Sequence, residues 1–419
     1  MDANILPLTL PAVEKREHFI PVRKADLIRL LADDDSLSDQ ERSQFLDLCR
    51  MLEATFHFEY HDELEKLKDA YAAFDPDRDT VDNELLRAHS NDGDVAALFE
   101  HMVTLLERAN FRHLDQEEIE AALNDTTDWG VRLDVDFDVF ERLEVYSRGE
   151  VTTTRTVRNF RTLFKKQEVE VPIYQRLVII FRLKDHERLA AQANLDAVTL
   201  KIFKNIPRVD LEMLFPGTKV CMTLLDRAKI LLPTISGVVV TIGKIINNAV
   251  GMLASGMSGV LAFLGLIGGT VGYGVKSFFG YLRAKDKYQL NLTKNLYYQN
   301  LDNNAGVLFR LLDEVEEQEF REAILAYSLL RREAPSGGWT QDELDRRAES
   351  FLVEQAGVDI DFEVDDALAK LKRLGLALET PTGRYIAIQL PEALVRLDAA
   401  WDAFFDFPAG DSEVAAAVA

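Results

Sequence analysis

The chain has 419 residues, 47% of them hydrophobic and 28% charged, and its formal net charge is −23. This length allows two or three domains that each bury a core. Two cysteines exclude a disulfide framework, and the acidic balance disfavours nucleic acid as a partner because phosphate neutralisation needs a cationic surface. The first residues lack a basic region followed by an apolar run, so we expect no cleavable signal peptide.

Charge is unevenly distributed along the sequence. Residues 151–229 hold 15 Lys and Arg against 8 Asp and Glu, a net charge of +7, so the rest of the chain carries −30. A basic block that ends where an apolar segment begins predicts a face held against anionic lipid headgroups. The alternative is a basic sheet domain with scattered, solvated charges.

The N-terminal part has helical periodicity. Ser38 and Glu41 form the S-x-x-E pattern of a capping box, and residues 45–67 follow it with apolar side chains at helical spacing. Residues 94–109 repeat that pattern. We therefore predict a helical domain over residues 1–125.

The period changes to two after Trp129, which indicates half-buried strands. The run from Leu177 to Phe181 is apolar on both faces, so it is predicted to be the central strand. These patterns predict a basic α+β domain of about five mixed or antiparallel strands over residues 126–228. The strand candidates are residues 131–137, 143–147, 151–157, 173–184 and 198–203.

A long apolar segment decides the predicted class. Between Lys229 and Lys276 the only ionisable residue is Lys244, and residues 245–275 are 31 consecutive uncharged residues. About twenty such residues span the hydrocarbon core of a bilayer. We therefore predict a transmembrane helical hairpin over residues 229–282 and an α+β membrane protein; a buried hairpin in a soluble protein is the alternative.

The hairpin carries three sets of candidate site residues. Small residues at spacing four let helices approach closely in lipid, whereas intramembrane polar groups are candidates for a pore lining. Cations beside the apolar run are candidates for contact with headgroups and place both flanks on the cytoplasmic side. The packing residues are Gly251, Ser255, Gly259, Gly265, Gly268, Gly269 and Gly272; the polar residues are Lys244, Asn247 and Asn248; the headgroup-facing residues are Arg227, Lys229, Lys276, Arg283 and Lys285.

The C-terminal third is predicted to be mainly helical. Residues 283–335 form a long helical segment with a stripe of uncharged polar side chains. Residues 336–407 follow the order helix, helix, β-hairpin of a winged helix: Thr340 and Glu343 form a capping box, Gly357 ends the first helix, and Asp361 caps the second. Residues 341–405 hold 14 acidic against 7 basic residues, which favours protein docking over DNA binding. Residues 408–419 are predicted to be a disordered tail.

Candidate chemistry is sparse, and we predict no catalytic residue and no cofactor. His57 and His61 stand four apart on a predicted helix, a spacing that can hold one metal ion, but helix histidines with ordinary partners are the better interpretation. Asp75, Asp77 and Asp79 resemble the start of a calcium loop, but the required glycine and glutamate are missing from later positions. A turn capped by carboxylates is the better interpretation.

Several blocks resemble a known family. They are residues 16–23 (REHFIPVR), 56–61 (FHFEYH), 74–77 (FDPD), 204–207 (KNIP) and 296–308 (LYYQNLDNNAGVL), followed by 313–319. This pattern, over roughly residues 16–335, resembles uncharacterised domain family 3754, which includes transmembrane protein 143 of mitochondria. The resemblance implies a membrane protein with about two spans and no established activity.

These observations predict a membrane-anchored, non-enzymatic scaffold or adaptor that self-associates through the glycine-rich hairpin. Its expected partners are an anionic lipid bilayer, further copies of the chain, and proteins recruited by the C-terminal domain, with no nucleic acid. The expected location is a bacterial inner membrane with both termini cytoplasmic, or a mitochondrial membrane. An oligomeric pore or channel is the first alternative, and a membrane-bound enzyme acting on lipid is the second.

Overall fold

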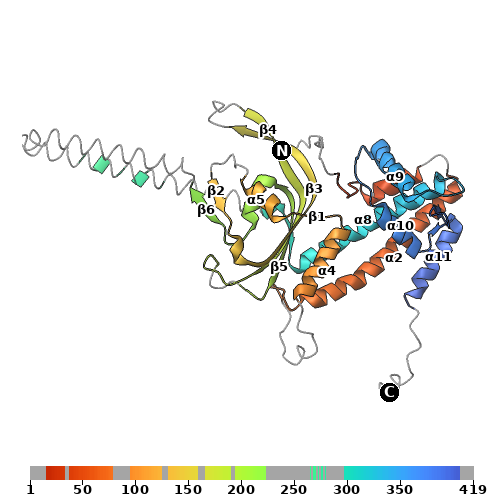
Figure 1. The fold of residues 1–419 in the computed structure, drawn as a ribbon, viewed down its shortest axis with the longest axis horizontal. Coiled ribbons are helices and arrows are strands. Elements are labelled where there is room, and N and C mark those ends of the chain that lie inside the picture. The colour runs from red at the N-terminus through yellow and green to blue at the C-terminus, as the bar shows by residue number, and fades with distance from the viewer. Residues whose placement is uncertain are drawn as a thin grey trace, which may run out of the picture.

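The computed structural model describes most of the chain. The described residues are 16–33, 37–78, 95–124, 131–158, 166–189, 194–222 and 297–405, together with the helical positions Gly265, Gly268, Gly269, Gly272, Val275, Lys276 and Phe279. Figure 1 shows a sheet beside a body of helices, with helix α8 (Ala305–Arg332) running from the sheet into that body. The fold is thus a mixture of helices and antiparallel sheet.

The main sheet has five strands in the order β1-β3-β4-β5-β7, and all neighbouring pairs are antiparallel. Its core is the segment Leu177–Ile180 of β4, whose residues are fully buried. The prediction of a central strand there is confirmed. The strands are β1 (Arg112–His113), β3 (Phe140–Arg158), β4 (Lys166–Leu183), β5 (Val198–Pro207) and β7 (Asn300–Asn303).

The two faces of the sheet belong to different hydrophobic cores. Val178 and Ile180 pack into the large core with the helical body, whereas Leu177, Ile179 and Phe181 pack into a smaller core. Alternation along one strand supplies both faces because successive side chains point in opposite directions. Around the smaller core lie α5 (Gln116–Asn124), η1 (Phe137–Val139), η3 (Arg208–Leu214) and the paired strands β2 (Val131–Asp134) and β6 (Lys219–Met222).

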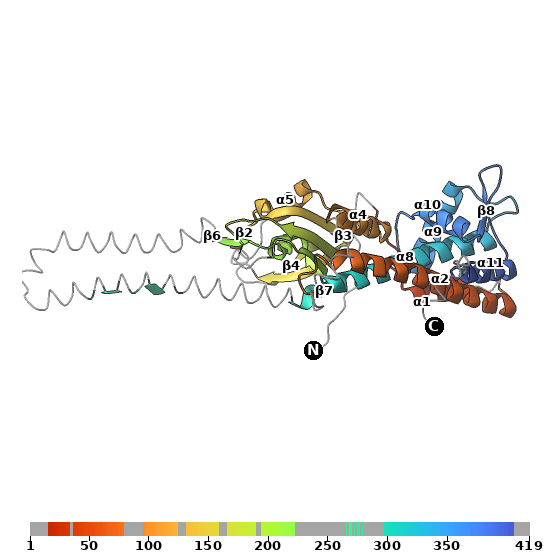
Figure 2. The ribbon, with the colours of Figure 1, turned by 90° about the horizontal axis from the view of Figure 1, so that it is seen from below.

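The helical body surrounds α8, and Figure 2 shows α2 lying along it. Leu308, Leu311 and Val315 of α8 are fully buried in the large core. The other elements of this body are α1 (Lys24–Ala32), α2 (Asp39–Tyr71), α4 (Val95–Arg108), α9 (Gln341–Ala356), α10 (Val364–Arg373), β8 (Ala377–Glu379), β9 (Tyr385–Ala387) and α11 (Leu390–Ala403).

The polar side of α8 is buried as well. Glu314, Gln318, Glu319, Arg321 and Glu322 are each at most 9% exposed. Buried charges need paired and hydrogen-bonded partners. Those partners come from the sheet, from α4 and from α10, so α8 is the common neighbour of regions that are distant in sequence.

Local signals in the sequence placed several helix ends correctly. Both predicted capping boxes are present: Ser38 with Glu41 at α2, and Thr340 with Glu343 at α9. Gly357 ends α9 in the left-handed conformation, with φ of +66°. These ends depend on contacts within a few residues, which is why the sequence alone predicts them.

Other expectations were wrong in detail. The two strands predicted over residues 143–157 are one continuous strand, β3. The helical segment expected to begin near residue 283 contains an edge strand, β7, followed by Asn304 at φ of 49° and then α8. Asp361 does not cap α10, which begins three residues later; its carboxylate lies 3.7 Å from the imidazole of His18 instead.

The predicted class of integral membrane protein is contradicted. Within the part of the chain that the structure describes, no helix combines the length and the apolar character that a membrane crossing requires. The predicted inner-membrane or mitochondrial location loses its basis with the span. Residues 230–264, most of the predicted hairpin, lie outside the described residues. An uncharged run shows that water is disfavoured as a neighbour, but it does not distinguish lipid from protein.

Candidate anion-binding pocket

The N-terminal segment, residues 16–23, ties distant parts of the fold together. At one end, Arg16 pairs with Glu349 and lies 3.2 Å from Asp359, both near α9 and α10. The backbone of Glu17 accepts a hydrogen bond from the Asp361 amide at 3.0 Å. At the other end, the Ile20 amide donates to Gln318 of α8. The segment therefore spans from the C-terminal helices to the sheet side of α8.

His18 adds a charge contact to this attachment. Its Nδ1 lies 2.9 Å from a carboxylate oxygen of Glu363 and 3.7 Å from Asp361. The hydrogen bond to Glu363, with further attraction from Asp361, raises the pKa of His18 to about 9 despite partial burial. The imidazole is therefore mainly cationic near neutral pH.

The attachment should weaken in alkaline solution. Because the pKa of His18 rises from 6.5 in the unfolded chain to about 9 in the folded one, its contribution is complete below about pH 6.5 and is lost as pH rises through 9. Urea unfolding of the wild type and of His18→Gln should differ at pH 6 and converge above pH 9. An equal difference at both pH values would show that this ion pair does not stabilise the fold.

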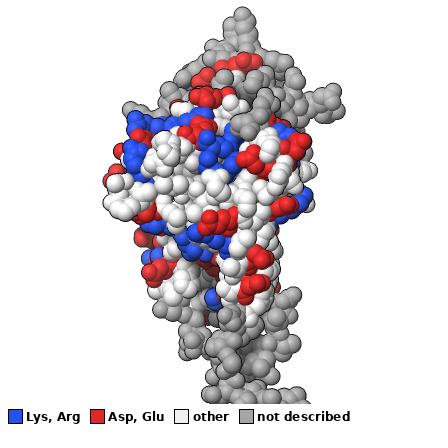
Figure 3. Space-filling view, turned by 90° about the vertical axis from the view of Figure 1, so that its right-hand side faces the viewer, with Lys and Arg blue, Asp and Glu red and all other residues white. Residues whose placement is uncertain are grey.

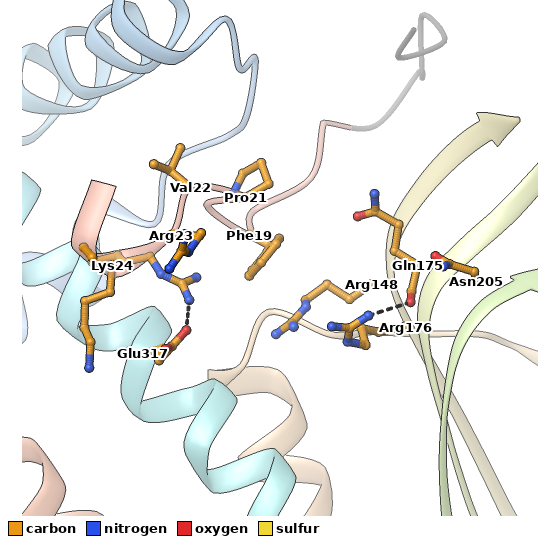
Figure 4. Close-up of a pocket in the computed structure, with 12 residues that line it drawn as sticks. Phe19, Pro21, Val22, Arg23, Lys24, Arg148, Gln175, Arg176, Asn205 and Glu317 are labelled. Carbon is orange, nitrogen blue, oxygen red and sulfur yellow. Dashed lines mark hydrogen bonds and ion pairs between the residues drawn. The ribbon is translucent and has the colours of Figure 1, made fainter. Parts of the chain in front are cut away.

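A pocket lies between this segment, the sheet and α8, and its volume is about 670 Å³. That volume falls in the range of pockets that hold small molecules. Five cations and one carboxylate are among its residues. Figure 4 shows the Phe19 ring between Arg23 and Arg148. The lining residues are Phe19, Pro21, Val22, Arg23, Lys24, Ala25, Arg148, Gln175, Arg176, Asn205, Glu317 and Arg321.

Two backbone positions shape the sheet side of the pocket. Gly149 on β3 has φ of +73°, and a Cβ there would collide with the side chain of Gln175 on β4. Glycine therefore lets Gln175 lie across β3. Asn205 also has positive φ, at 52°, and its carbonyl accepts a hydrogen bond from Gln299 at 2.8 Å. Both amide side chains reach the pocket from these positions.

Arg148 is deeply buried, with 5% of its surface exposed. It donates a hydrogen bond to the Ala109 carbonyl at 2.9 Å and pairs with Glu314. The rings of Phe19 and Phe111 lie 4.1 and 4.4 Å from its guanidinium carbon, within the range of cation–π contacts. Burial lowers the pKa of Arg148 to about 10, which leaves it charged at neutral pH.

Glu314 is shared among three arginines. Besides Arg148, the Nε atoms of Arg176 and Arg310 each lie 3.2 Å from one of its oxygens. Burial would raise the pKa of Glu314, but these cations outweigh burial and hold the pKa below its ordinary value. One carboxylate cannot neutralise three guanidinium groups, so positive charge remains beside the pocket.

Arg321 approaches the pocket from α8. It donates to the Ile20 carbonyl at 3.1 Å and pairs with Glu317. Its Nε is buried and has no hydrogen-bond acceptor among the described residues. A buried donor without an acceptor is costly and is normally satisfied by a ligand, an ion or water.

Comparison with known families covers part of this site. Residues 174–306 match the family described as a protein of unknown function, DUF3754. The DUF3754 match covers about a third of the chain and includes Gln175, Arg176 and Asn205 of the pocket. It supports the resemblance to an uncharacterised family, but gives no support to the narrower likeness to transmembrane protein 143. No solved structure matches the chain.

The histidines proposed for a metal lie elsewhere. His57 is on the exposed side of α2, 3.0 Å from a carboxylate oxygen of Glu316, and His61 is also exposed. The described residues contain no group of three or more ligands that could hold a metal ion. The turn predicted near Asp75 is confirmed, since its carboxylate accepts a hydrogen bond from the Asp77 amide at 3.0 Å. Asp79 lies outside the described residues.

Most residues predicted for the hairpin are outside the described part of the chain. These are Gly251, Ser255, Gly259, Lys244, Asn247, Asn248, Arg227, Lys229, Arg283 and Lys285. Gly265, Gly268, Gly269, Gly272 and Lys276 are helical and exposed, and no other group lies near a Cβ built on any of these glycines. Helix packing through the glycines therefore stays a prediction.

Helix α10 is the second helix of the predicted winged helix, the one that would contact DNA in a DNA-binding protein. Its cations are paired within the chain. Lys370 is buried against Glu322, Lys372 pairs with Glu379, and Arg373 binds Glu59 of α2 through both carboxylate oxygens. Figure 3 shows Lys and Arg interspersed with Asp and Glu on the end of the molecule that carries α9 to α11. This arrangement favours contact with proteins over contact with phosphate backbones.

The pocket is not evident from the sequence alone. Its arginines come from four separate segments, and each is unremarkable in its own neighbourhood. One usable signal was the block at residues 16–23, which carries both Phe19 and Arg23. A second was Arg148 beside Gly149, because a glycine within a strand often marks a bulge or a close approach of another group.

Proposed function

We propose that this protein is a non-enzymatic binding protein whose pocket holds a small molecule bearing phosphate groups. One observation carries the proposal: Arg148, Arg176 and Arg321 converge on a pocket whose nearby carboxylates, Glu314 and Glu317, are too few to neutralise them. Guanidinium groups bind phosphate through paired, charge-assisted hydrogen bonds. An anion would supply the missing charge.

The lining favours binding over catalysis. The described residues of the pocket include no Ser, Thr, Cys or His that would act as nucleophile or general base. Lys24 pairs with Glu53, outside the pocket lining, and Glu317 pairs with Arg321. The charged groups are thus suited to holding an anion rather than to transferring a proton.

Isothermal titration with inorganic pyrophosphate tests this function. We expect the wild-type protein to bind it, and Arg176→Gln to weaken binding by about 10- to 100-fold, the value of a charge-assisted hydrogen bond. Arg182→Gln is the matched control, because Arg182 lies on the same strand as Arg176, with its Nε 3.3 Å from Glu141, but does not line the pocket. Its affinity should stay within about twofold of the wild type.

Two results would contradict the proposal. One is the absence of pyrophosphate binding by folded wild-type protein. The other is an equal loss of affinity in Arg176→Gln and Arg182→Gln, which would indicate a general effect of net charge. Binding should also weaken as salt is added, since the attraction is electrostatic.

We also propose that the C-terminal region recruits a protein partner, as an adaptor does. The internal pairing of Lys370, Lys372 and Arg373 supports a protein partner over nucleic acid. A mobility-shift assay with duplex DNA tests this choice. Tight, salt-dependent binding of DNA would contradict it.

A further inference from the structure

The pocket contains two groups of arginines from different parts of the fold. Arg148 and Arg176 come from strands β3 and β4, whereas Arg23 precedes α1 and Arg321 belongs to α8. Figure 4 shows Arg23 and Arg148 on opposite sides of the Phe19 ring. The guanidinium carbons of Arg148 and Arg321 lie 4.1 and 5.5 Å from the centre of that ring. Phe19 therefore separates a sheet-side group from a helix-side group.

Within the pocket lining, one carboxylate, Glu317, faces the four arginines of the two groups. On the sheet side, Glu314 is divided among Arg148, Arg176 and Arg310. On the helix side, Glu317 pairs with Arg321, and Arg23 is 83% exposed with its Nε 4.0 Å from the Asp26 carboxylate. A single anion in one group would leave the arginines of the other group to the carboxylates of the chain alone.

One buried donor points to a ligand on the helix side. Arg321 is 5% exposed, and its Nε has no acceptor in the described part of the chain. Arg148, on the sheet side, is equally buried, and it donates hydrogen bonds to Glu314 and to the Ala109 carbonyl. The two most buried cations of the pocket thus belong to different groups, and both are placed before any ligand arrives.

The size of the pocket agrees with a ligand that reaches both groups. A volume of about 670 Å³ suits a whole small molecule rather than one phosphate group. The rest of the lining includes the amides of Gln175 and Asn205 and the apolar side chains of Pro21 and Val22. These groups would contact the uncharged or bridging atoms of such a molecule.

We propose that the ligand carries two or more phosphate groups and bridges the two groups of arginines, one phosphate on each. This inference rests on the proposed function and specifies the class of ligand: a polyphosphate or a bisphosphorylated small molecule. Two linked phosphates gain from effective concentration, because binding the first one brings the second to its site. The ligand would hold the N-terminal segment against the sheet.

Titrations with inorganic phosphate and tripolyphosphate test the bridge. We expect tripolyphosphate to bind at least about 10-fold more tightly than phosphate. Arg23→Gln and Arg176→Gln should each weaken tripolyphosphate binding by about 10-fold or more, whereas phosphate should respond to only one of them. Arg29→Gln is the control for Arg23→Gln, because Arg29 also pairs with Asp26 but does not line the pocket.

The outcomes separate this inference from the proposed function. If Arg23→Gln, like Arg29→Gln, leaves tripolyphosphate binding unchanged while Arg176→Gln abolishes it, the pocket binds anions but the bridge is wrong. If each substitution weakens phosphate and tripolyphosphate equally, the bridge is also wrong. If neither anion binds the folded wild-type protein, the proposed function fails as well. Circular dichroism of each variant establishes that it is folded.

Discussion

Replacing Glu314 by glutamine should destabilise the protein and tighten its binding of pyrophosphate. The change keeps the size of the side chain but removes the counter-charge of Arg148, which is 5% exposed. Leaving a buried charge without its partner costs about 3–5 kcal/mol. The same substitution increases the uncompensated positive charge beside the pocket, so an added anion has more to neutralise.

Urea unfolding with and without pyrophosphate measures both effects. Without the anion, the free energy of unfolding of Glu314→Gln should fall by about 3 kcal/mol or more. With saturating pyrophosphate, the difference from the wild type should shrink, because a ligand stabilises most the form that binds it most tightly. A difference that pyrophosphate does not change would show that the anion does not neutralise Arg148 and its neighbours.

The second large effect concerns the interior of the helical body. Glu322 of α8 is 1% exposed and lies 2.7 Å from the Nζ of Lys370 on α10, which is itself buried. It also accepts hydrogen bonds from Gln318 and Asn110. Glu322→Ala removes the acceptor for three donors, and we expect a loss of about 3–5 kcal/mol in the free energy of unfolding.

A surface pair provides the comparison for that measurement. Glu392 and Arg396 form an exposed ion pair one turn apart on α11, and Glu392→Ala should cost less than about 1 kcal/mol. Urea unfolding of both variants under one set of conditions compares the two. Equal small losses would mean that Lys370 finds sufficient charge from Asp366, 3.0 Å away, after Glu322 is removed.

The parts of the fold that the sequence predicts are those that local rules determine. The capping boxes at Ser38 and Thr340, the glycine that ends α9 and the apolar central strand all depend on near neighbours. By contrast, β7 pairs with β5 although the two strands are about one hundred residues apart in sequence, and no local pattern predicts that pairing. The uncharged run after Lys244 led to a membrane class that the described helices do not support.

The pocket illustrates the same difference at the level of function. Four separate segments carry the pocket arginines Arg23, Arg148, Arg176 and Arg321. In its own stretch of sequence, each arginine looks like an ordinary cation of a surface or a strand. Motif searches look for residues that are close in sequence, such as His57 and His61, which the structure leaves exposed on α2. A composite site of this kind becomes visible only when the chain is folded.

The pocket is completed by contacts between residues that are far apart in sequence, and this determines when it can form during synthesis. Arg16 and Glu349 are 333 residues apart, and Ile20 and Arg321 are 301 apart. A ribosome adds about 5–20 residues per second, so the N-terminal segment must wait on the order of 15–60 s for its partners to emerge. During that interval the nascent chain displays Phe19 and Ile20 without their α8 contacts. Binding competence would therefore arise late and abruptly, and would mark a chain that has been translated at least through Arg321 of α8.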